Sequence, residues 1–274
     1  MNIIKSSTSL NDKERNDILF NGDVVIFNNI PAMLELNFHL RELIKGVFQG
    51  DIEFEKLDES NILEFHCNID ILQKKFRSNK LYKNLFALSL KQSGMRIEKN
   101  YSDIIFMRSV PPVHTTNNQY RGKIGYHRDT WGSNIQNQIN WWSTIFPITD
   151  KNTLVLYPRY WSEAVENNTD HWSYKDFCNA RITAKKNKSD INYPYSPSAT
   201  QIINEENAVS ITINPGDLLC FSSAHLHGST SEPRDYCRFN IELRTFSDDD
   251  LCLNHPPPNI DNKKICLITV GSNV

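Results

Sequence analysis

The sequence predicts a mainly β protein, an antiparallel barrel or jelly roll with N-terminal and peripheral α-helices. Short alternating or β-branched segments, separated by turn residues, fill most of residues 101–246, and this spacing is typical of jelly rolls. Helical periodicity dominates the first hundred residues. No internal repeat or low-complexity linker divides the 274 residues, so we expect one domain. It would comprise a mixed N-terminal elaboration (1–100), a jelly-roll core (101–246) and a C-terminal tail (247–274).

The N-terminal part contains one expected strand and two or three expected helices. The stretch Gly22–Ile30, "GDVVIFNNI", is apolar and β-branched, which favours a strand. Residues 31–50 begin with a proline, end with a glycine and carry apolar residues at helical spacing, which predicts a helix. Residues 68–94 show the same periodicity over a length that fits one or two helices.

Alternation and β-branched residues predict strands in most segments after residue 101. Two of these strands should end at Pro147 and Pro158, because proline cannot donate a hydrogen bond to a neighbouring strand. A turn is expected at Pro215-Gly216, and a helix around Trp172–Arg181. The segments expected to hold strands are 103–112, 138–148, 152–158, 207–223 and 236–246.

The composition argues against nucleic-acid and membrane partners. The formal net charge is −2 and the pI is near 6.4, so no broad basic field attracts nucleic acid or anionic lipid. The first residues lack the apolar core of a signal peptide, and no run of about 18 apolar residues could span a membrane. The six cysteines are scattered without a CxxC pair, which is typical of reduced thiols. We therefore expect a cytoplasmic protein with a small-molecule substrate, and we assign no oligomeric state.

The stretch "GYHRDTWGSNIQNQINWW" (125–142) contains two candidate metal ligands, His127 and Asp129. Two residues apart on a strand, their side chains would point to the same face. The pair alone also fits a salt-bridged surface turn. His225 and His227 are both candidates for a third ligand. Two histidines and one carboxylate suit an Fe(II) ion that activates oxygen.

An arginine, Arg238, lies eleven residues after His227 on the next alternating segment. A hairpin between the two would place their strands side by side. The Arg238 guanidinium could then face the metal cavity and hold a carboxylate through two hydrogen bonds. Arg244 shares the strand parity of Arg238, so it is a second candidate for this role or for contact with an acidic substrate.

Together these motifs resemble those of a known enzyme superfamily. Four stretches of this sequence resemble the distal half of the motif pattern of the Fe(II)/2-oxoglutarate-dependent oxygenases. Within that superfamily they look most similar to the phytanoyl-CoA dioxygenase-like branch. His127-x-Asp129 fits the proximal half, and the resemblance covers roughly residues 101–246. It implies a double-stranded β-helix (jelly-roll or cupin-like) core. The four stretches are Gly216-Asp217-Leu218-Leu219, Phe221-Ser222, Leu226-His227-Gly228-Ser229 and Arg238.

The resemblance also implies roles for individual residues. His127, Asp129 and His227 would ligate Fe(II). Arg238 would hold the distal carboxylate of 2-oxoglutarate, and O2 would be the second cosubstrate. The family's reaction oxidises an unactivated carbon and releases succinate and CO2. Because related halogenases replace the carboxylate ligand by a small residue, Asp129 favours hydroxylation, desaturation or ring closure over halogenation.

The polar strand after the His-x-Asp motif predicts a cavity wall. Gln138, Asn140 and Trp142 would share one face of this strand. Burying the two amides without partners would cost about 1–3 kcal/mol each. A cavity filled by water or substrate relieves that cost, and exposure of the same face to solvent is the alternative.

Three further residues are candidates for substrate binding. Trp131 could form a lid or stack on the substrate, or else pack at the rim of the barrel. His225 could contact the substrate or support the metal ligands, or else be a histidine that is hydrogen-bonded inside the barrel. Arg244, if it points inward, could bind an acidic group of the substrate.

The expected function is hydroxylation of a small or medium-sized polar metabolite, amino-acid-like or carboxylated, in a biosynthetic pathway. The same chemistry could instead desaturate the substrate or close a ring. A first alternative is a cupin-like metalloenzyme that does not use 2-oxoglutarate, and Arg238 discriminates against it. A second alternative is a binding module without catalysis, which three intact metal ligands disfavour.

Overall fold

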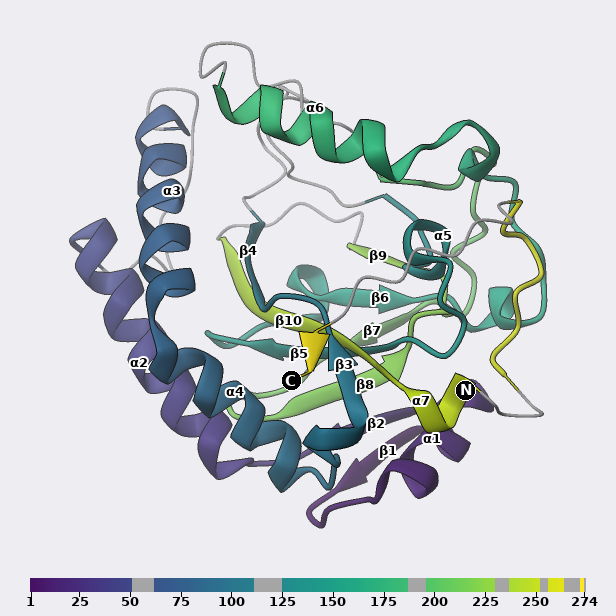
Figure 1. Cartoon of the computed structure of the whole chain (residues 1–274), viewed down its shortest axis with the longest axis horizontal. Helices are drawn as coiled ribbons and strands as arrows, with labels where there is room; N and C mark the ends of the chain where they lie inside the picture. Colours follow the sequence, from purple (N-terminus) through teal and green to yellow (C-terminus); the bar gives the residue numbers. More distant parts are fainter. Residues whose placement is uncertain are drawn as a thin grey trace.

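The computed structural model describes residues 1–50, 62–110, 125–186, 196–229, 237–251, 256–263 and 272–273. Two β-sheets pack against each other, and several helices lie outside the larger sheet (Figure 1). Apolar side chains of both sheets, among them Leu219 and Phe221 from the larger and Leu156 and Ile211 from the smaller, share one buried cluster. None of the helices in these ranges combines the length and apolar character that a membrane span requires.

Within the described residues the larger sheet has eight strands in the order β1-β2-β8-β5-β10-β3-β11, with β4 also paired to β10. The pair β1 and β2 is parallel, and the other pairs are antiparallel. Strands form in all five segments where they were expected after residue 101. The bounds are β1 Ile3–Ser6, β2 Val24–Phe27, β3 Asn100–Ser102, β4 Phe106–Val110, β5 Ile139–Thr144, β8 Leu218–Ser222, β10 Arg238–Ser247 and β11 Ser272–Asn273.

In the part of the chain that the structure describes, the smaller sheet has three strands in the order β7-β6-β9. They are β6 Leu154–Leu156, β7 Val209–Ile211 and β9 His227–Ser229. The predicted hairpin between His227 and Arg238 is wrong, because β9 pairs with β6 whereas β10 pairs with β5, β4 and β3. Consecutive strands β8, β9 and β10 alternate between the two sheets. His227 and Arg238 therefore approach each other from opposite sheets, and part of the segment that joins them lies outside the described residues.

Helices α2, α3 and α4 cover the outer face of the larger sheet (Figure 1). Helix α2 begins at a proline, as expected, and buries Met33, Leu36, Leu40 and Ile44. These residues form one buried cluster with side chains of α3 and α4 and with the outward side chains of β5, β8 and β10. In the described chain helices cover more residues than strands, so "mainly β" holds for the core alone. The helices are α1 Asp12–Phe20, α2 Pro31–Phe48, α3 Ile62–Ser78, α4 Lys80–Gln92, α5 Thr130–Ser133, α6 Tyr174–Lys186 and α7 Asp248–Leu251.

The two faces of strand β5 have different surroundings, which accounts for its unusual polarity. Ile139 and Trp141 point to the helices and belong to the outer cluster. Trp142 belongs to the cluster between the sheets, and Asn140 lines a pocket there. Asn140 and Trp142 are only 6% and 4% exposed, so exposure of this face to solvent is excluded.

The Gly-Asp pair before β8 has a structural role. Gly216 has a φ of +100°, which glycine adopts without the steric cost that other residues meet. The carboxylate of Asp217 accepts hydrogen bonds from the backbone N–H groups of Asn29 and Asn214, each at 2.9 Å. This motif therefore fixes the start of β8 and the link between β2 and α2.

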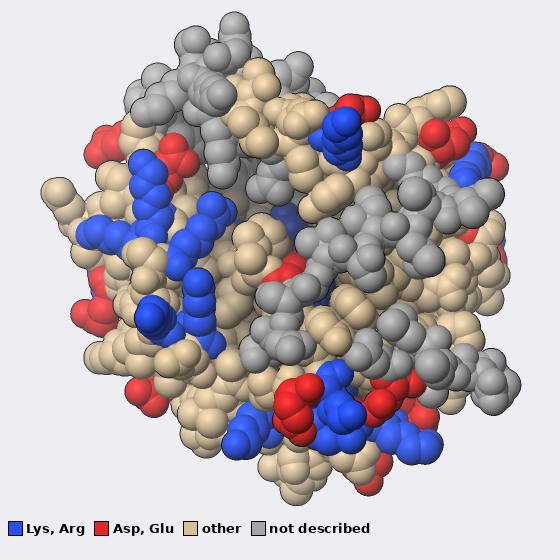
Figure 2. All heavy atoms as spheres, viewed as in Figure 1, with Lys and Arg blue, Asp and Glu red and all other residues tan. Residues whose placement is uncertain are grey.

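Exposed lysines and arginines gather over α3 and α4, as Figure 2 shows. They include Lys74, Lys75, Arg77, Lys80 and Lys83. With a formal net charge of −2 for the whole chain, these side chains form a local basic cluster.

Candidate metal centre

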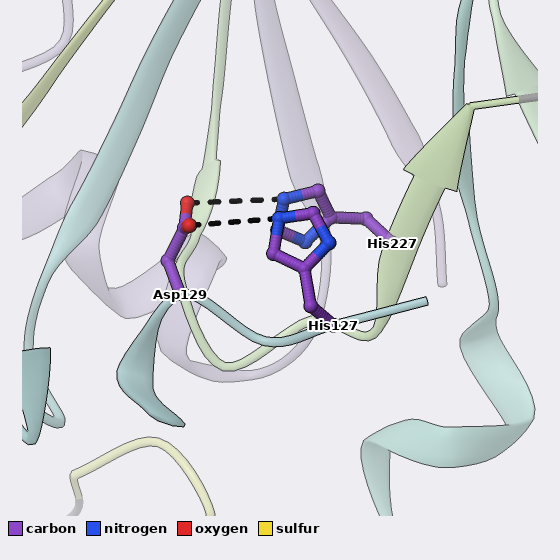
Figure 3. A group of neighbouring side chains, drawn as sticks. All are labelled: His127, Asp129 and His227. Atoms are coloured by element: carbon purple, nitrogen blue, oxygen red, sulfur yellow. Dashed lines mark ion pairs between the residues drawn. The ribbon is translucent and has the colours of Figure 1, made fainter. Parts of the chain in front are cut away.

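Two histidines and one aspartate converge between the sheets (Figure 3). His127 Nε2 lies 3.7 Å from Asp129 Oδ1, and His227 Nε2 lies 3.8 Å from Asp129 Oδ2. One ligand atom from each residue lies within 4.8 Å of the other two. Because nitrogen and oxygen ligands bind a divalent metal at about 2.0–2.2 Å, a single ion can contact all three.

The backbone delivers both imidazoles in the same orientation. His127 and His227 pair with each other through two backbone hydrogen bonds of 2.9 Å. Each Nδ1 faces a backbone carbonyl, Gly125 O at 2.8 Å and His225 O at 2.9 Å. Since a carbonyl only accepts, each Nδ1 carries the proton, which leaves the Nε2 lone pairs for a metal.

Burial keeps both histidines neutral. It lowers the pKa of His127 to about 4, and the nearby His227 ring adds to this effect. Burial also lowers the pKa of His227, although the charge of Asp129 opposes the shift. Metal ligation needs neutral imidazole, so both side chains are ready to bind at neutral pH.

The His-x-Asp motif lies in a turn, so its expected place within a regular strand is wrong. Asp129 has helical backbone angles and directly precedes the short helix α5. The intervening Arg128 is buried and donates hydrogen bonds to the carbonyls of Ala224 and Tyr160 at 2.5 and 2.6 Å. Its guanidinium also pairs with the Asp261 carboxylate at 2.9 Å. These contacts, and not strand geometry, fix the turn that carries the ligands.

The structure places Trp131 away from the pocket, which corrects its expected role as a lid. Its side chain is 0% exposed and packs among Tyr160, Val165 and Leu226. The indole N–H donates to Asp261 at 2.7 Å. Trp131 therefore packs behind the metal ligands and has no surface free for a substrate.

Asp129 accepts three hydrogen bonds from two neighbours. Asn140 Nδ2 donates to Oδ2 at 2.7 Å. Arg244 Nε donates to Oδ2 at 3.1 Å and Arg244 Nη2 to Oδ1 at 3.3 Å. Burial alone would raise the pKa of Asp129, but the Arg244 charge and the Arg244 hydrogen bonds hold it below its ordinary value. The carboxylate is therefore ionised and oriented.

A chain of hydrogen bonds, in which each group donates to the next, satisfies the buried amides of Gln138 and Asn140. Gln138 Nε2 donates to the Ser223 hydroxyl at 2.9 Å, and this hydroxyl donates to Asn140 Oδ1 at 2.7 Å. Asn140 then donates to Asp129. The buried Gln138 therefore supports the metal ligand Asp129 through Ser223 and Asn140. Of the three residues predicted to form the cavity wall, Asn140 and Trp142 line the pocket and Gln138 does not.

Arg238 lines the same pocket as the three candidate metal ligands. The pocket is lined by these four residues together with Trp142 and further residues of both sheets. Arg238 is 3% exposed, and its guanidinium carbon lies 5.9 Å from the centre of the Trp142 ring. The other polar or charged lining residues are Arg108, Asn140, Ser229, Glu242 and Arg244.

Sequence reasoning missed a charged pair in this pocket. Arg108 Nε lies 2.6 Å from Glu242 Oε1. Strand parity could have found Glu242, because it lies between Arg238 and Arg244 at steps of two. Arg108 has no such signal, since it comes from β4 and reaches the site only through its pairing with β10.

His225 lies outside the pocket lining and does not have its expected hydrogen bond. Its side chain is 0% exposed, and neither ring nitrogen has a hydrogen-bond partner among the described residues. Its ring centre lies 4.5 Å from that of Trp161 and 6.4 Å from that of Phe221. A direct substrate contact is therefore unsupported, and only its backbone carbonyl serves the centre, through His227.

Replacing His225 by phenylalanine is expected to make the protein more resistant to acid. Burial lowers the pKa of His225 to about 3, whereas the unfolded chain has the ordinary value near 6.5. Between these values the unfolded state binds more protons, so the wild type loses about 1.4 kcal/mol of stability per pH unit as pH falls. Urea unfolding at pH 7 and pH 5 measures this. An equal pH dependence in the two proteins would contradict it, and metal binding should persist because the backbone carbonyl stays.

Among known proteins, similarity to this chain was found in solved structures alone. No protein-family model matches the sequence, and no curated protein matches it. Among solved structures, EvdO2 from Micromonospora carbonacea var. aurantiaca superposes with a TM-score of 0.51 and 11% identity, over 93% of this chain and 96% of that chain. Its complex with 2-oxoglutarate gives a TM-score of 0.50 and 11% identity, over 88% and 92%. EctD from S. alaskensis, in its apoform, gives 0.51 and 12% identity, over 88% and 79%.

This chain shares their fold. The likeness concerns the fold alone, and it does not single out the phytanoyl-CoA dioxygenase-like branch.

Proposed function

We propose that the protein is an Fe(II)- and 2-oxoglutarate-dependent oxygenase with a single jelly-roll (double-stranded β-helix) domain. The observation that carries the proposal is the meeting of two neutral imidazoles and one ionised carboxylate in the pocket that also contains Arg238. The alternation of β8, β9 and β10 between two sheets supports the jelly roll. A cluster shared by α2, β5 and β10 supports one domain.

The donor set fits ferrous iron. His127, His227 and Asp129 provide two nitrogens and one oxygen, the set found in non-haem Fe(II) oxygenases. A structural zinc site would close the coordination with a fourth protein ligand, and the clusters found among the described residues offer no fourth one here. Three protein ligands leave coordination positions for small molecules on the pocket side.

Arg238 and Ser229 suit the carboxylate of 2-oxoglutarate that is distant from the metal. The buried guanidinium can hold a carboxylate through two parallel hydrogen bonds. Ser229 lines the same pocket, is 2% exposed, and its hydroxyl has no hydrogen-bond partner among the described residues. EvdO2, which shares this fold, was solved in complex with 2-oxoglutarate, and this supports 2-oxoglutarate as the cosubstrate.

The remaining pocket residues shape the site for a substrate. When bound, the iron, 2-oxoglutarate and O2 supply the oxidation: one oxygen atom goes to the substrate and the other to succinate, with loss of CO2. Trp142, Phe221 and Leu154 give the pocket an apolar, water-excluding wall. Arg108 and Glu242 add charges of both signs. We propose hydroxylation of a small or medium-sized polar metabolite, amino-acid-like or carboxylated, by a cytoplasmic biosynthetic enzyme.

The direct test is formation of succinate from 2-oxoglutarate in the presence of Fe(II) and O2. A screen of amino acids and small carboxylic acids should raise the rate for the correct substrate class. Absence of succinate from folded, iron-loaded protein across the whole screen would contradict the proposal.

Replacing Arg238 by methionine is expected to weaken 2-oxoglutarate binding without loss of the metal. Removing a buried charged hydrogen-bond partner costs about 2–5 kcal/mol, which corresponds to at least a 30-fold rise in the dissociation constant. Titration of 2-oxoglutarate into the metal-loaded protein by calorimetry measures it. Affinity equal to the wild type would show that Arg238 does not hold 2-oxoglutarate, and absence of binding to the wild type would favour a metalloenzyme that does not use it. Replacing the exposed Arg159 by methionine is the control and should change nothing.

A further inference from the structure

The two carboxylate oxygens of Asp129 have different surroundings. Oδ2 accepts from Asn140 at 2.7 Å and from Arg244 Nε at 3.1 Å. Among the described residues, Oδ1 accepts one longer hydrogen bond, from Arg244 Nη2 at 3.3 Å. Each oxygen also faces one histidine nitrogen, Oδ1 facing His127 Nε2 at 3.7 Å and Oδ2 facing His227 Nε2 at 3.8 Å, so the difference between them lies in the hydrogen bonds. Oδ2 is therefore anchored, and Oδ1 has more room for another partner.

The Arg244 guanidinium spans both oxygens as a fork. A metal that binds a carboxylate through both oxygens would need this same space between them. The fork geometry of guanidinium and carboxylate fills that space with two parallel hydrogen bonds. A metal must then approach Asp129 from the side, through one oxygen.

The two donors are themselves held in place before any metal binds. Asn140 and Arg244 face each other across β5 and β10 as a register pair. The Ser223 hydroxyl donates to Asn140 Oδ1 at 2.7 Å, and Arg244 Nη1 lies 2.9 Å from Asp103 Oδ2. Because their positions are fixed by other contacts, little side-chain entropy is lost when they orient Asp129.

We propose that Asn140 and Arg244 are positioning residues that anchor Oδ2 and leave Oδ1 as the one oxygen that Asp129 offers to the metal. The proposal deepens the proposed function and rests on its metal site. It assigns Arg244 to the metal ligand and so replaces its expected role in binding substrate or cosubstrate. A one-oxygen carboxylate keeps three coordination positions free for small molecules.

The test compares Arg244→Lys and Asn140→Ala with the wild type and with Arg159→Lys as a control on an exposed ion pair. Lysine keeps the positive charge but cannot form the fork, so it separates orientation from charge. Mn(II) affinity is measured by electron paramagnetic resonance of the free ion. Both site variants should bind Mn(II) about 10- to 100-fold more weakly, the usual loss when a residue that orients a metal ligand is removed.

A second readout reports the coordination itself. The Co(II)-substituted protein has visible absorption bands that depend on the number and arrangement of ligands. Both site variants should change these bands, and the control variant should not. Thermal unfolding without metal shows whether each variant is folded, and Asn140→Ala decides the matter alone if Arg244→Lys does not fold.

Wild-type Mn(II) affinity and an unchanged Co(II) spectrum in a folded site variant would overturn the proposal. Failure of the wild type itself to bind Mn(II) would instead overturn the proposed function, so the two failures are distinguishable.

Discussion

Replacement of His227 by alanine is expected to abolish the stabilisation that a divalent metal gives to this protein. For the wild type, Mn(II) at about 100 times its dissociation constant should add about 2.7 kcal/mol to the free energy of unfolding. The variant lacks one of three ligand atoms, so its affinity should fall by more than the roughly 100-fold that loss of a supporting residue costs. Chemical unfolding with and without Mn(II) measures both values.

The alanine variant should remain folded, because the hydrogen bonds that pair residue 227 with His127 come from the backbone. His171, whose side chain is 87% exposed, provides the matched control. Its alanine variant should gain the full stabilisation from Mn(II). A His227→Ala protein that is stabilised as strongly as the wild type would show that the metal binds elsewhere.

Replacement of Asp261 by asparagine is expected to destabilise the fold more than any surface charge change. Asp261 pairs with Arg128 at 2.9 Å, with side-chain exposures of 4% and 2%. Burial already lowers the pKa of Arg128, which Asp261 opposes. Removing one partner leaves a buried charge uncompensated, at a cost of about 3–5 kcal/mol. Because Arg128 lies between two metal ligands, metal affinity should fall as well.

Asparagine keeps an oxygen that can still accept from the Trp131 indole. Its amide nitrogen replaces the oxygen that accepts from Val165 N and Arg128 Nε, so the expected loss combines the charge with these hydrogen bonds. Glu163→Gln is the matched change in an exposed pair, with Arg159 at 2.7 Å, and should cost less than about 1 kcal/mol. Urea unfolding compares the two variants. Equal losses would mean that Asp261 does not compensate the buried guanidinium.

The candidate centre could be predicted from the sequence because its chemistry depends on few residues of unusual type. His127, Asp129, His227 and Arg238 were selected from their spacing and from family resemblance, and the structure places all four around one pocket. The polar segment also carried a usable signal. Its amides predicted a cavity wall, with exposure to solvent as the alternative. Asn140 does line the pocket, whereas Gln138 donates to Ser223 and lies outside the lining.

Contacts between distant segments could not be predicted in this way. Asp261 lies in a tail without periodicity, and only the folded chain brings its carboxylate to Arg128 and Trp131. The expected pairing of the strands around His227 and Arg238 failed for a related reason. Sequence proximity favours a hairpin, but β9 gains its hydrogen bonds from β6, more than seventy residues earlier.

The most direct measurement is the visible absorption of the protein after anaerobic addition of Fe(II) and 2-oxoglutarate. A keto acid that chelates ferrous iron held by His127, Asp129 and His227 gives a metal-to-ligand charge-transfer band. We expect this band in the wild type, its loss in His227→Ala, and succinate once O2 enters. Folded, iron-loaded wild-type protein that shows neither the band nor succinate would contradict the assignment.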